Sequence, residues 1–245
     1  MIGLTDVHID RPIIAMISQN LQLVSNRIKL ACTAADRPQD AVSLLAVTKT
    51  FNAAAVLEAA AHGQFRFGEN YVQEALDKMD ALADARAKGG QPLEWHLIGP
   101  LQSNKTRAVA ERFDWVHSVD RLKIAQRLSE QRPAHLPPLN VLVQVNTSGE
   151  DSKSGTGPDE ALALAREVAA LPRLQLRGVM ALPAPTADAA EQNRQLAAVR
   201  VVYEHLRSQG LPLDTLSMGM SSDLEAAVAQ GSTMVRVGTA LFGQR

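Results

Sequence analysis

The chain has 245 residues, of which 46% are hydrophobic, so it can bury a large core and shows no compositional sign of disorder. Its 25 Lys and Arg nearly balance its 26 Asp and Glu, which argues against a protein whose overall field attracts nucleic acid or an anionic membrane. The single cysteine, Cys32, excludes an internal disulfide and a thiolate metal cage.

The N-terminal part of the chain predicts an amphipathic helix and no targeting signal. The opening "MIGLTDVHIDRP" contains Asp6 and Asp10 and lacks the basic-then-apolar pattern of a signal peptide. Apolar residues then recur in steps of three and four across 12–35, which predicts one helix that ends at the breaker "ADRPQD". Because no apolar run is long enough to cross a bilayer, we expect a cytoplasmic protein without membrane contact.

Beyond this helix, strand-like and helix-like segments alternate along the rest of the chain. The expected strands are "AVSLLAVTK", "QFRFGEN", "LEWHLIG", "FDWVHSV", "LNVLVQVN", "LQLRGVMAL", "LDTLSMG" and "TMVRVG". Helical patterns lie between them, at about 53–62, 70–88, 103–111, 120–131, 158–170, 187–209 and 222–230.

This alternation predicts the fold class. Repeated βα units require right-handed crossovers and a parallel sheet, and eight such units in a chain of this length are typical of a closed barrel. We therefore predict an α/β protein with a (β/α)8 TIM-like barrel and an additional N-terminal helix, forming a single domain over residues 1–245. A doubly wound open sheet is the alternative.

Two loops at the predicted strand ends are suited to bind an anion. The working face of a barrel lies at the carboxyl ends of its strands, and phosphate sites often use the loops after the seventh and eighth. The segment "SMGMSSD" supplies small residues and hydroxyls and leads into a helix expected to begin at about Ser222. In "RVGTALFG", Gly238 allows close backbone approach and Thr239 adds a hydroxyl.

Lys49, which follows the first predicted strand, suggests which anion is bound. A lysine there is often a solvated charge, but lysine is also the side chain that condenses with aldehydes. Across a barrel mouth it would face the two loops, so a phosphorylated aldehyde such as pyridoxal 5′-phosphate fits both features. Arg236, on the same strand face as Gly238, could donate to the pyridine nitrogen. Because arginine stays protonated, the cofactor would then be a poor electron sink.

The residues that carry these features resemble a known family. The segments "LLAVTKT", "FGENYVQEALDK", "EWHLIGPLQSNK", "VLVQVNTSGEDSKSG", "LRGVMALPAP" and "LSMGMSSDLEAAVAQGSTMVRVGTALFG" together are similar to the pyridoxal-phosphate homeostasis protein family. The similarity runs from about residue 12 to residue 243, and the family's fold resembles the N-terminal barrel of bacterial alanine racemase. The resemblance implies a protein that buffers, carries and delivers pyridoxal 5′-phosphate to apo forms of dependent enzymes, with no robust catalytic turnover. We also expect a monomer.

The resemblance also implies roles for individual residues. The cofactor-binding residues it implies are Lys49, Asn70, His96, Ser217, Ser221, Arg236, Gly238 and Thr239. Lys49 would hold the cofactor as an aldimine, Arg236 would contact the pyridine nitrogen, and the two loops would hold the phosphate, with Asn70 and His96 facing or supporting the ring. Lys153 matches a lysine linked to cofactor release or transfer. No residue is assigned a catalytic role and no metal site is expected.

The sequence departs from the family pattern in two places. Many members carry a second lysine two residues after the cofactor lysine, and here that position is Phe51. Many also end in an aromatic and basic tail, whereas this sequence ends in "FGQR". Roles that depend on those groups are therefore not expected here.

Two other functions remain open at this stage. A pyridoxal-phosphate-dependent amino-acid racemase would use the same lysine but needs a second proton donor, typically a tyrosine. Of the two tyrosines, Tyr203 lies within a predicted helix and Tyr71 follows the second strand, where it could reach the mouth. A barrel isomerase for a phosphorylated sugar would need no cofactor. His96 and His117 lack metal-ligand spacing and are interpreted as hydrogen-bonded structural residues.

Overall fold

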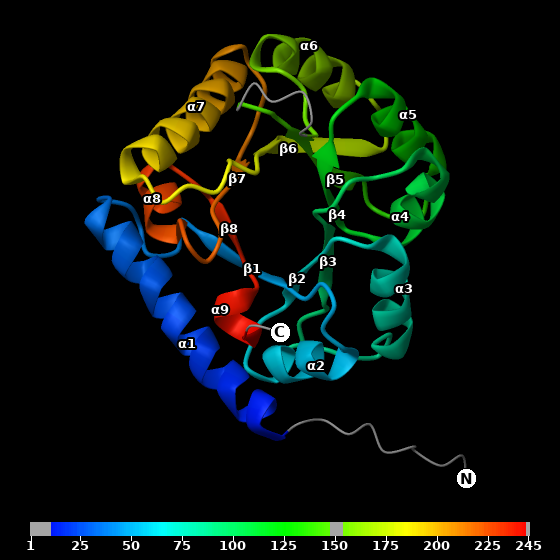
Figure 1. Ribbon diagram of the computed structural model, residues 1–245. Helices are drawn as coiled ribbons and strands as arrows, with labels where there is room; N and C mark the ends of the chain where they lie inside the picture. Colours follow the sequence, from blue (N-terminus) through cyan, green and yellow to red (C-terminus); the bar gives the residue numbers. More distant parts are fainter. Residues whose placement is uncertain (1–10, 148–153, 244–245) are drawn as a thin grey trace.

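Eight parallel strands close into a barrel in the computed structural model, which describes residues 11–147 and 154–243 (Figure 1). The strands follow one another around the barrel in chain order, and β8 pairs with β1 to close it. The predicted (β/α)8 barrel is therefore confirmed, and the open sheet is excluded. In the part of the chain that is described, no helix is long and apolar enough to cross a membrane.

The elements match the predicted alternation. The strands are β1 Ser43–Val47, β2 Arg66–Glu69, β3 Glu94–Leu97, β4 Trp115–Val119, β5 Leu139–Gln144, β6 Leu174–Met180, β7 Thr215–Ser217 and β8 Met234–Val237. The helices are α1 Arg11–Ala34, α2 Ala53–Ala61, α3 Val72–Ala81, α4 Thr106–Arg112, α5 Leu122–Gln131, α6 Pro158–Ala169, α7 Ala189–Ser208, α8 Leu224–Ala229 and α9 Thr239–Phe242. A 3-10 turn, Ser103–Lys105, precedes α4.

The expected helix at 70–88 is wrong in its second half. Helix α3 ends at Ala81, and a tight turn follows in which Arg86 bridges to Pro92. Gly89 and Gly90 both adopt positive φ angles, 92° and 82°, which glycine alone adopts without steric cost. The Ala, Arg and Lys composition of this segment favours a helix, but the paired glycines reverse the chain.

The additional helix α1 packs against helices that belong to the first and last parts of the barrel. It contacts α2, α8 and α9, so it covers the side of the barrel where β8 meets β1 (Figure 1). Its buried face includes Ile17, Leu21, Val24 and Ile28, which recur in steps of three and four. The N-terminal helix is therefore part of the ring of helices that surrounds the strands.

The interior of the barrel holds both apolar and polar side chains. Trp115, Leu142 and Met180 form an apolar cluster within it. His96 and His117 are fully buried beside this cluster, and the His96 ring stacks on Trp115 with ring centroids 5.2 Å apart. Buried polar groups need hydrogen-bond partners, and the two histidines bond to each other, to Glu94 at the start of β3 and to Ser217 at the end of β7.

Candidate functional site

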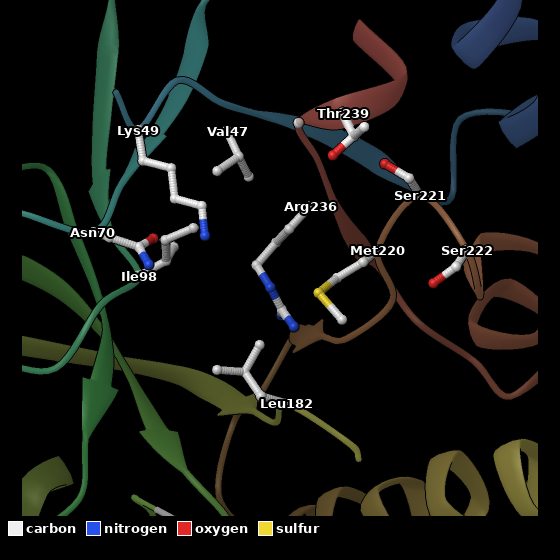
Figure 2. Close-up of a pocket in the computed structure, with 11 residues that line it drawn as sticks. Val47, Lys49, Asn70, Ile98, Leu182, Met220, Ser221, Ser222, Arg236 and Thr239 are labelled. Atoms are coloured by element: carbon white, nitrogen blue, oxygen red, sulfur yellow. The ribbon is translucent and has the colours of Figure 1, made fainter. Parts of the chain in front are cut away.

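A cavity of about 470 Å³ opens at the carboxyl ends of the strands, where barrels place their working face. It is lined by Val47, Lys49, Asn70, Ile98, Leu182, Met220, Ser221, Ser222, Arg236, Gly238 and Thr239. In Figure 2, Lys49 lies on one side, Ser221 and Thr239 lie on the other, and Arg236 lies between them. The structure thus brings six of the eight predicted residues into one pocket.

The other two predicted residues do not line this pocket. Ser217 and His96 are completely buried below it, where they contact protein groups. The sequence analysis also missed lining residues, among them the apolar Ile98, Leu182 and Met220. Each of these follows a strand, but as isolated apolar residues they gave no signal that separates a pocket wall from core.

A buried ion pair holds the backbone just before Lys49. The ammonium of Lys78 donates to the Thr48 carbonyl at 2.6 Å and to Glu69 Oε1 at 2.7 Å. The Thr48 hydroxyl donates to the same Glu69 oxygen at 2.6 Å. Burial raises the pKa of Glu69, and its hydrogen bonds to Lys78 and Thr48 oppose that rise. The end of β1 is therefore fixed to α3 by charged hydrogen bonds.

The residue after Lys49 is held by the same cluster. Lys78 also donates to Glu74 Oε1 at 2.7 Å, and this carboxylate oxygen accepts the backbone N–H of Thr50. Thr50 has a φ of 64°, a left-handed conformation that is unfavourable for a β-branched residue. The backbone on both sides of Lys49 is thus anchored, which restricts where its half-buried side chain can reach.

Phe51 joins two loops of the site. Its ring packs against the ring of Phe242 in α9, with centroids 5.0 Å apart. The segment that carries Lys49 therefore rests on the short helix that follows Gly238. An aromatic contact here ties together the lysine side and the hydroxyl side of the pocket.

The loop after β7 turns sharply to place its serines. Gly219 has a φ of 97°, and a Cβ there would lie 2.4 Å from the Cβ of Ala227, so only glycine fits. The expected helix at 222–230 begins later, at Leu224, and Ser221 and Ser222 lie in the turn before it. The Ser221 hydroxyl accepts the N–H of Ala240 at 3.4 Å, which links this loop to α9.

Helix α9, which the sequence did not predict, presents backbone donors to the pocket. Among the described residues, the N–H groups of Gly238 and Thr239 have no hydrogen-bond acceptor, as is usual in the first turn of a helix. A Cβ at Gly238 would lie 3.2 Å from the carbonyl oxygen of Val47, which also lines the pocket. Hydroxyls and free N–H groups thus converge at this end of the cavity.

Helix α1 supports both of these loops from outside the barrel. Arg27 makes two hydrogen bonds to the Glu225 carboxylate, at 2.8 and 2.9 Å, and a third to the Ser221 carbonyl at 3.2 Å. Asn20 donates to the Leu241 carbonyl in α9 at 2.9 Å. The N-terminal helix therefore holds the backbone of the hydroxyl-bearing loops in place.

Arg236 is a buried cation that faces the pocket. It is only 3% exposed, and burial lowers its pKa to about 10, an effect that the charge of Asp223 partly opposes. Nη1 donates to the carbonyl and hydroxyl of Ser217, and Nη2 to the Ala181 carbonyl, each at 2.7 Å. These bonds use three of its five N–H groups. Arg236 therefore stays charged at neutral pH and keeps donors for a ligand.

His96 has two hydrogen-bond partners. One lies at the start of β3, away from the pocket, and the other lies beside His96 in the core. Its Nε2 is 2.8 Å from Glu94 Oε1, and its Nδ1 is 2.9 Å from Nε2 of His117. Nδ1 of His117 is in turn 3.1 Å from the Ser217 hydroxyl. His96 was expected either to face the cofactor ring or to support it. It does not line the pocket, and its hydrogen bonds place it in a buried chain that ends at Arg236.

We expect the free energy of unfolding to fall as the pH falls below about 6.5, the ordinary histidine pKa. Burial lowers the pKa of His96, and it lowers that of His117 well below the usual value. In this window the unfolded chain binds protons that the folded chain does not, so stability rises with pH and is lost on acidification. The slope should reach up to about 1.4 kcal/mol per pH unit for each histidine.

Urea unfolding between about pH 7.5 and 5.5 measures this slope. His117→Gln should reduce it, and His135→Gln, at an exposed histidine, should leave it unchanged. A His117→Gln slope equal to that of the unmodified protein would contradict the prediction.

The remaining predicted residues lie elsewhere. Tyr203 is buried and donates to the Leu213 carbonyl at 3.2 Å, and Tyr71 is 59% exposed and does not line the pocket. Lys153 lies outside the described residues. Within residues 11–147 and 154–243, no cluster of His, Cys, Asp and Glu is arranged to hold a metal ion.

Comparisons with known proteins agree with the barrel fold. Residues 19–245 match the family model "Alanine racemase, N-terminal domain". A "Pyridoxal phosphate homeostasis protein" of Pseudomonas aeruginosa is 60% identical over 229 residues, which cover 94% of this chain and 96% of that protein.

Two solved structures extend the comparison. The structure of PipY of Synechococcus elongatus with PLP bound is 38% identical and has a TM-score of 0.79, with 93% of this chain and 100% of that chain covered. Alanine racemase of Corynebacterium glutamicum is 21% identical with a TM-score of 0.63, covering 95% of this chain and 62% of that chain, and shares the fold.

Proposed function

Because this chain belongs to the family of the pyridoxal phosphate homeostasis proteins, built on the alanine racemase N-terminal domain, we propose that it binds pyridoxal 5′-phosphate and buffers, carries and delivers this cofactor in the cytoplasm. The observation that carries the proposal is the convergence of an amine, a cation and a set of anion donors in one pocket. Bound pyridoxal phosphate would supply an aldehyde that condenses reversibly with primary amines.

The residues present fit this cofactor. Lys49 is the proposed point of covalent attachment, because its backbone is anchored on both sides and its side chain lines the pocket. The proposed phosphate ligands are the hydroxyls of Ser221 and Thr239 and the free N–H groups of Gly238 and Thr239. Arg236 is the proposed donor to the pyridine nitrogen, and Asn70 the proposed ring contact. A cavity of about 470 Å³ is within the usual range for small-molecule sites.

The lining of the pocket favours holding the cofactor over turning over a substrate. Racemisation needs a second acid or base opposite the lysine. None of the lining residues that the structure describes is a tyrosine, histidine, cysteine or carboxylic acid. A permanently charged Arg236 near the ring nitrogen would also leave that nitrogen unprotonated and weaken the ring as an electron sink.

Ser221→Ala is expected to weaken retention of pyridoxal phosphate by about 1–3 kcal/mol, the usual cost of removing one donor from a charged acceptor. Equilibrium dialysis of the apo-protein measures this, with pyridoxal, which lacks the phosphate, as a second ligand. Pyridoxal should bind far more weakly, and Ser221→Ala should leave its affinity nearly unchanged.

Ser208→Ala, on the outer helix α7, provides the matched control and should bind both ligands like the unmodified protein. Equal affinities of the unmodified protein for pyridoxal and pyridoxal phosphate would contradict the assignment of the two loops to the phosphate.

The holo-protein is expected to pass its cofactor to the apo form of a pyridoxal-phosphate-dependent enzyme. The measurement is the rate at which the recipient gains activity, compared with the same amount of free pyridoxal phosphate. Proton exchange at the α-carbon of amino acids, followed in deuterated water, is the counter-assay. Turnover in the ordinary enzyme range of about 1–10³ s⁻¹ would favour the racemase instead.

A further inference from the structure

A continuous chain of hydrogen bonds crosses the barrel interior from the amino ends of the strands to the pocket at their carboxyl ends. It begins at Glu94, the first residue of β3, and passes through His96, His117 and Ser217 to Arg236. Its four links measure 2.8, 2.9, 3.1 and 2.7 Å. The three middle residues are completely buried or nearly so, and the chain therefore lies in a medium where each bond polarises the next.

The direction of every bond in the chain follows from its ends. A carboxylate only accepts, so His96 must donate to Glu94 through Nε2–H. A neutral His96 then accepts at Nδ1, which requires His117 to donate through Nε2–H. Nδ1 of His117 accepts the Ser217 hydroxyl proton, and the hydroxyl oxygen accepts from Arg236. Both histidines are thereby fixed as neutral Nε2–H tautomers.

The chain joins the buried cation to a carboxylate at the opposite end. Asp223 is the carboxylate whose charge acts on Arg236 from nearby, and neither of its oxygens bonds the guanidinium among the described residues. At the far end, Glu94 Oε1 also accepts from Arg66 Nε at 3.0 Å. The charge of Arg236 acts electrostatically on His117, and the charges of Glu94 and Arg66 act on His96.

We propose that His117 and Ser217 are positioning residues that fix the guanidinium of Arg236 toward the pocket. His96 and Glu94 support them, so that Glu94, at the amino ends of the strands, acts on the pocket at their carboxyl ends. The proposal rests on the proposed function only in its choice of ligand. The chain of hydrogen bonds is present in the protein alone and can be tested without any cofactor.

The first test is nitrogen NMR of the cofactor-free protein labelled at histidine. The expected result is that His96 and His117 both carry their proton on Nε2 at neutral pH, and that Ser217→Ala disturbs the pattern at His117 more than at His96. A proton on Nδ1 of either histidine, or a charged His117, would overturn the proposal, because the directions deduced above would then be impossible.

The second test compares two acid-to-amide changes at the amino ends of strands. Glu94→Gln removes the charge that ends the hydrogen-bond chain, while Asp214→Asn removes a carboxylate that pairs with Arg177 and makes no hydrogen bond within that chain. We expect Glu94→Gln to weaken pyridoxal phosphate retention about 3- to 10-fold and to shift the absorbance of the bound cofactor, since a polarised network loses its terminal charge. Asp214→Asn should change neither, because Asp214 makes no hydrogen bond to any of the five residues from Glu94 to Arg236, and thermal unfolding reports separately on folding.

A third variant separates failure of this inference from failure of the proposed function. Arg236→Gln should reduce retention and shift the absorbance more than Glu94→Gln does, and combining the two should add little beyond Arg236→Gln alone. If Arg236→Gln has an effect while Glu94→Gln behaves like Asp214→Asn, the chain does not position Arg236. If Arg236→Gln itself has no effect on the bound cofactor, the role proposed for Arg236 is wrong, and the histidine tautomers still report on the chain.

Discussion

Lys49→Ala is expected to abolish covalent attachment of pyridoxal phosphate completely, which is the largest effect on function that the structure predicts. Lys49 is the lysine that lines the pocket, and its backbone is held on both sides by hydrogen bonds to Lys78 and Glu74. Borohydride reduction of the loaded protein, followed by peptide mapping, should place a pyridoxyl group on Lys49. The visible absorbance of the bound cofactor should be lost in the variant.

Lys105→Ala serves as the matched control, because Lys105 also follows a strand of the barrel but does not line the pocket. It should retain the label at Lys49 and the unmodified absorbance. Labelling confined to Lys105 in the unmodified protein would refute the assignment. Residual noncovalent binding by Lys49→Ala is compatible with it, because the phosphate ligands remain.

The largest effect on stability is expected from Lys78→Met, at about 3–5 kcal/mol, the usual result of removing one partner from a buried ion pair. Both Lys78 and Glu69 are almost completely buried, at 5% and 0% exposure. Without the ammonium, the Glu69 carboxylate keeps only the Thr48 hydroxyl, and its Oε2 already has no hydrogen-bond partner among the described residues. Urea unfolding measures the loss, and an unchanged m-value would show that it reflects stability alone.

Two further variants test the cause of that loss. Lys123→Met, at an exposed position of α5, should change stability by no more than about 0.5 kcal/mol. The double variant Glu69→Gln with Lys78→Met should recover part of the loss, because it removes the stranded charge. A double variant that is less stable than Lys78→Met would show that packing, and not the uncompensated carboxylate, determines the cost.

Local sequence patterns predicted the strands because alternation and turn residues act over short distances. All eight predicted strands form, and each lies within the segment that predicted it. The short helix α9 was missed because four residues are too few to show a helical period. Helix α3 ends early, at Ala81, and the segment beyond it turns back at Gly89 and Gly90 so that Arg86 bridges to Pro92, a pairing that its helical composition does not signal.

Strand register explains which predicted residues reach the pocket. Ser217 ends β7, yet it pairs with Met234, the first residue of β8, and so it lies below the level of Arg236 and Gly238. A residue at the end of a short strand can therefore lie deep in the barrel. This stagger depends on how neighbouring strands pair, which no single segment of sequence contains.

The sequence by itself determined the barrel, the strand-end lysine and the two hydroxyl-bearing loops, because each depends on residues that are neighbours in the chain. Only the tertiary structure decided that Arg27 of α1 supports the Ser221 loop, that Lys78 anchors the backbone before Lys49, and that His117 joins Glu94 to Arg236. The partners in the first two contacts lie 194 and 30 positions apart, and His117 lies 21 positions from His96 and 100 from Ser217. Such pairs meet only when the barrel closes and its helices pack around it, so their roles follow from the fold and not from any local pattern.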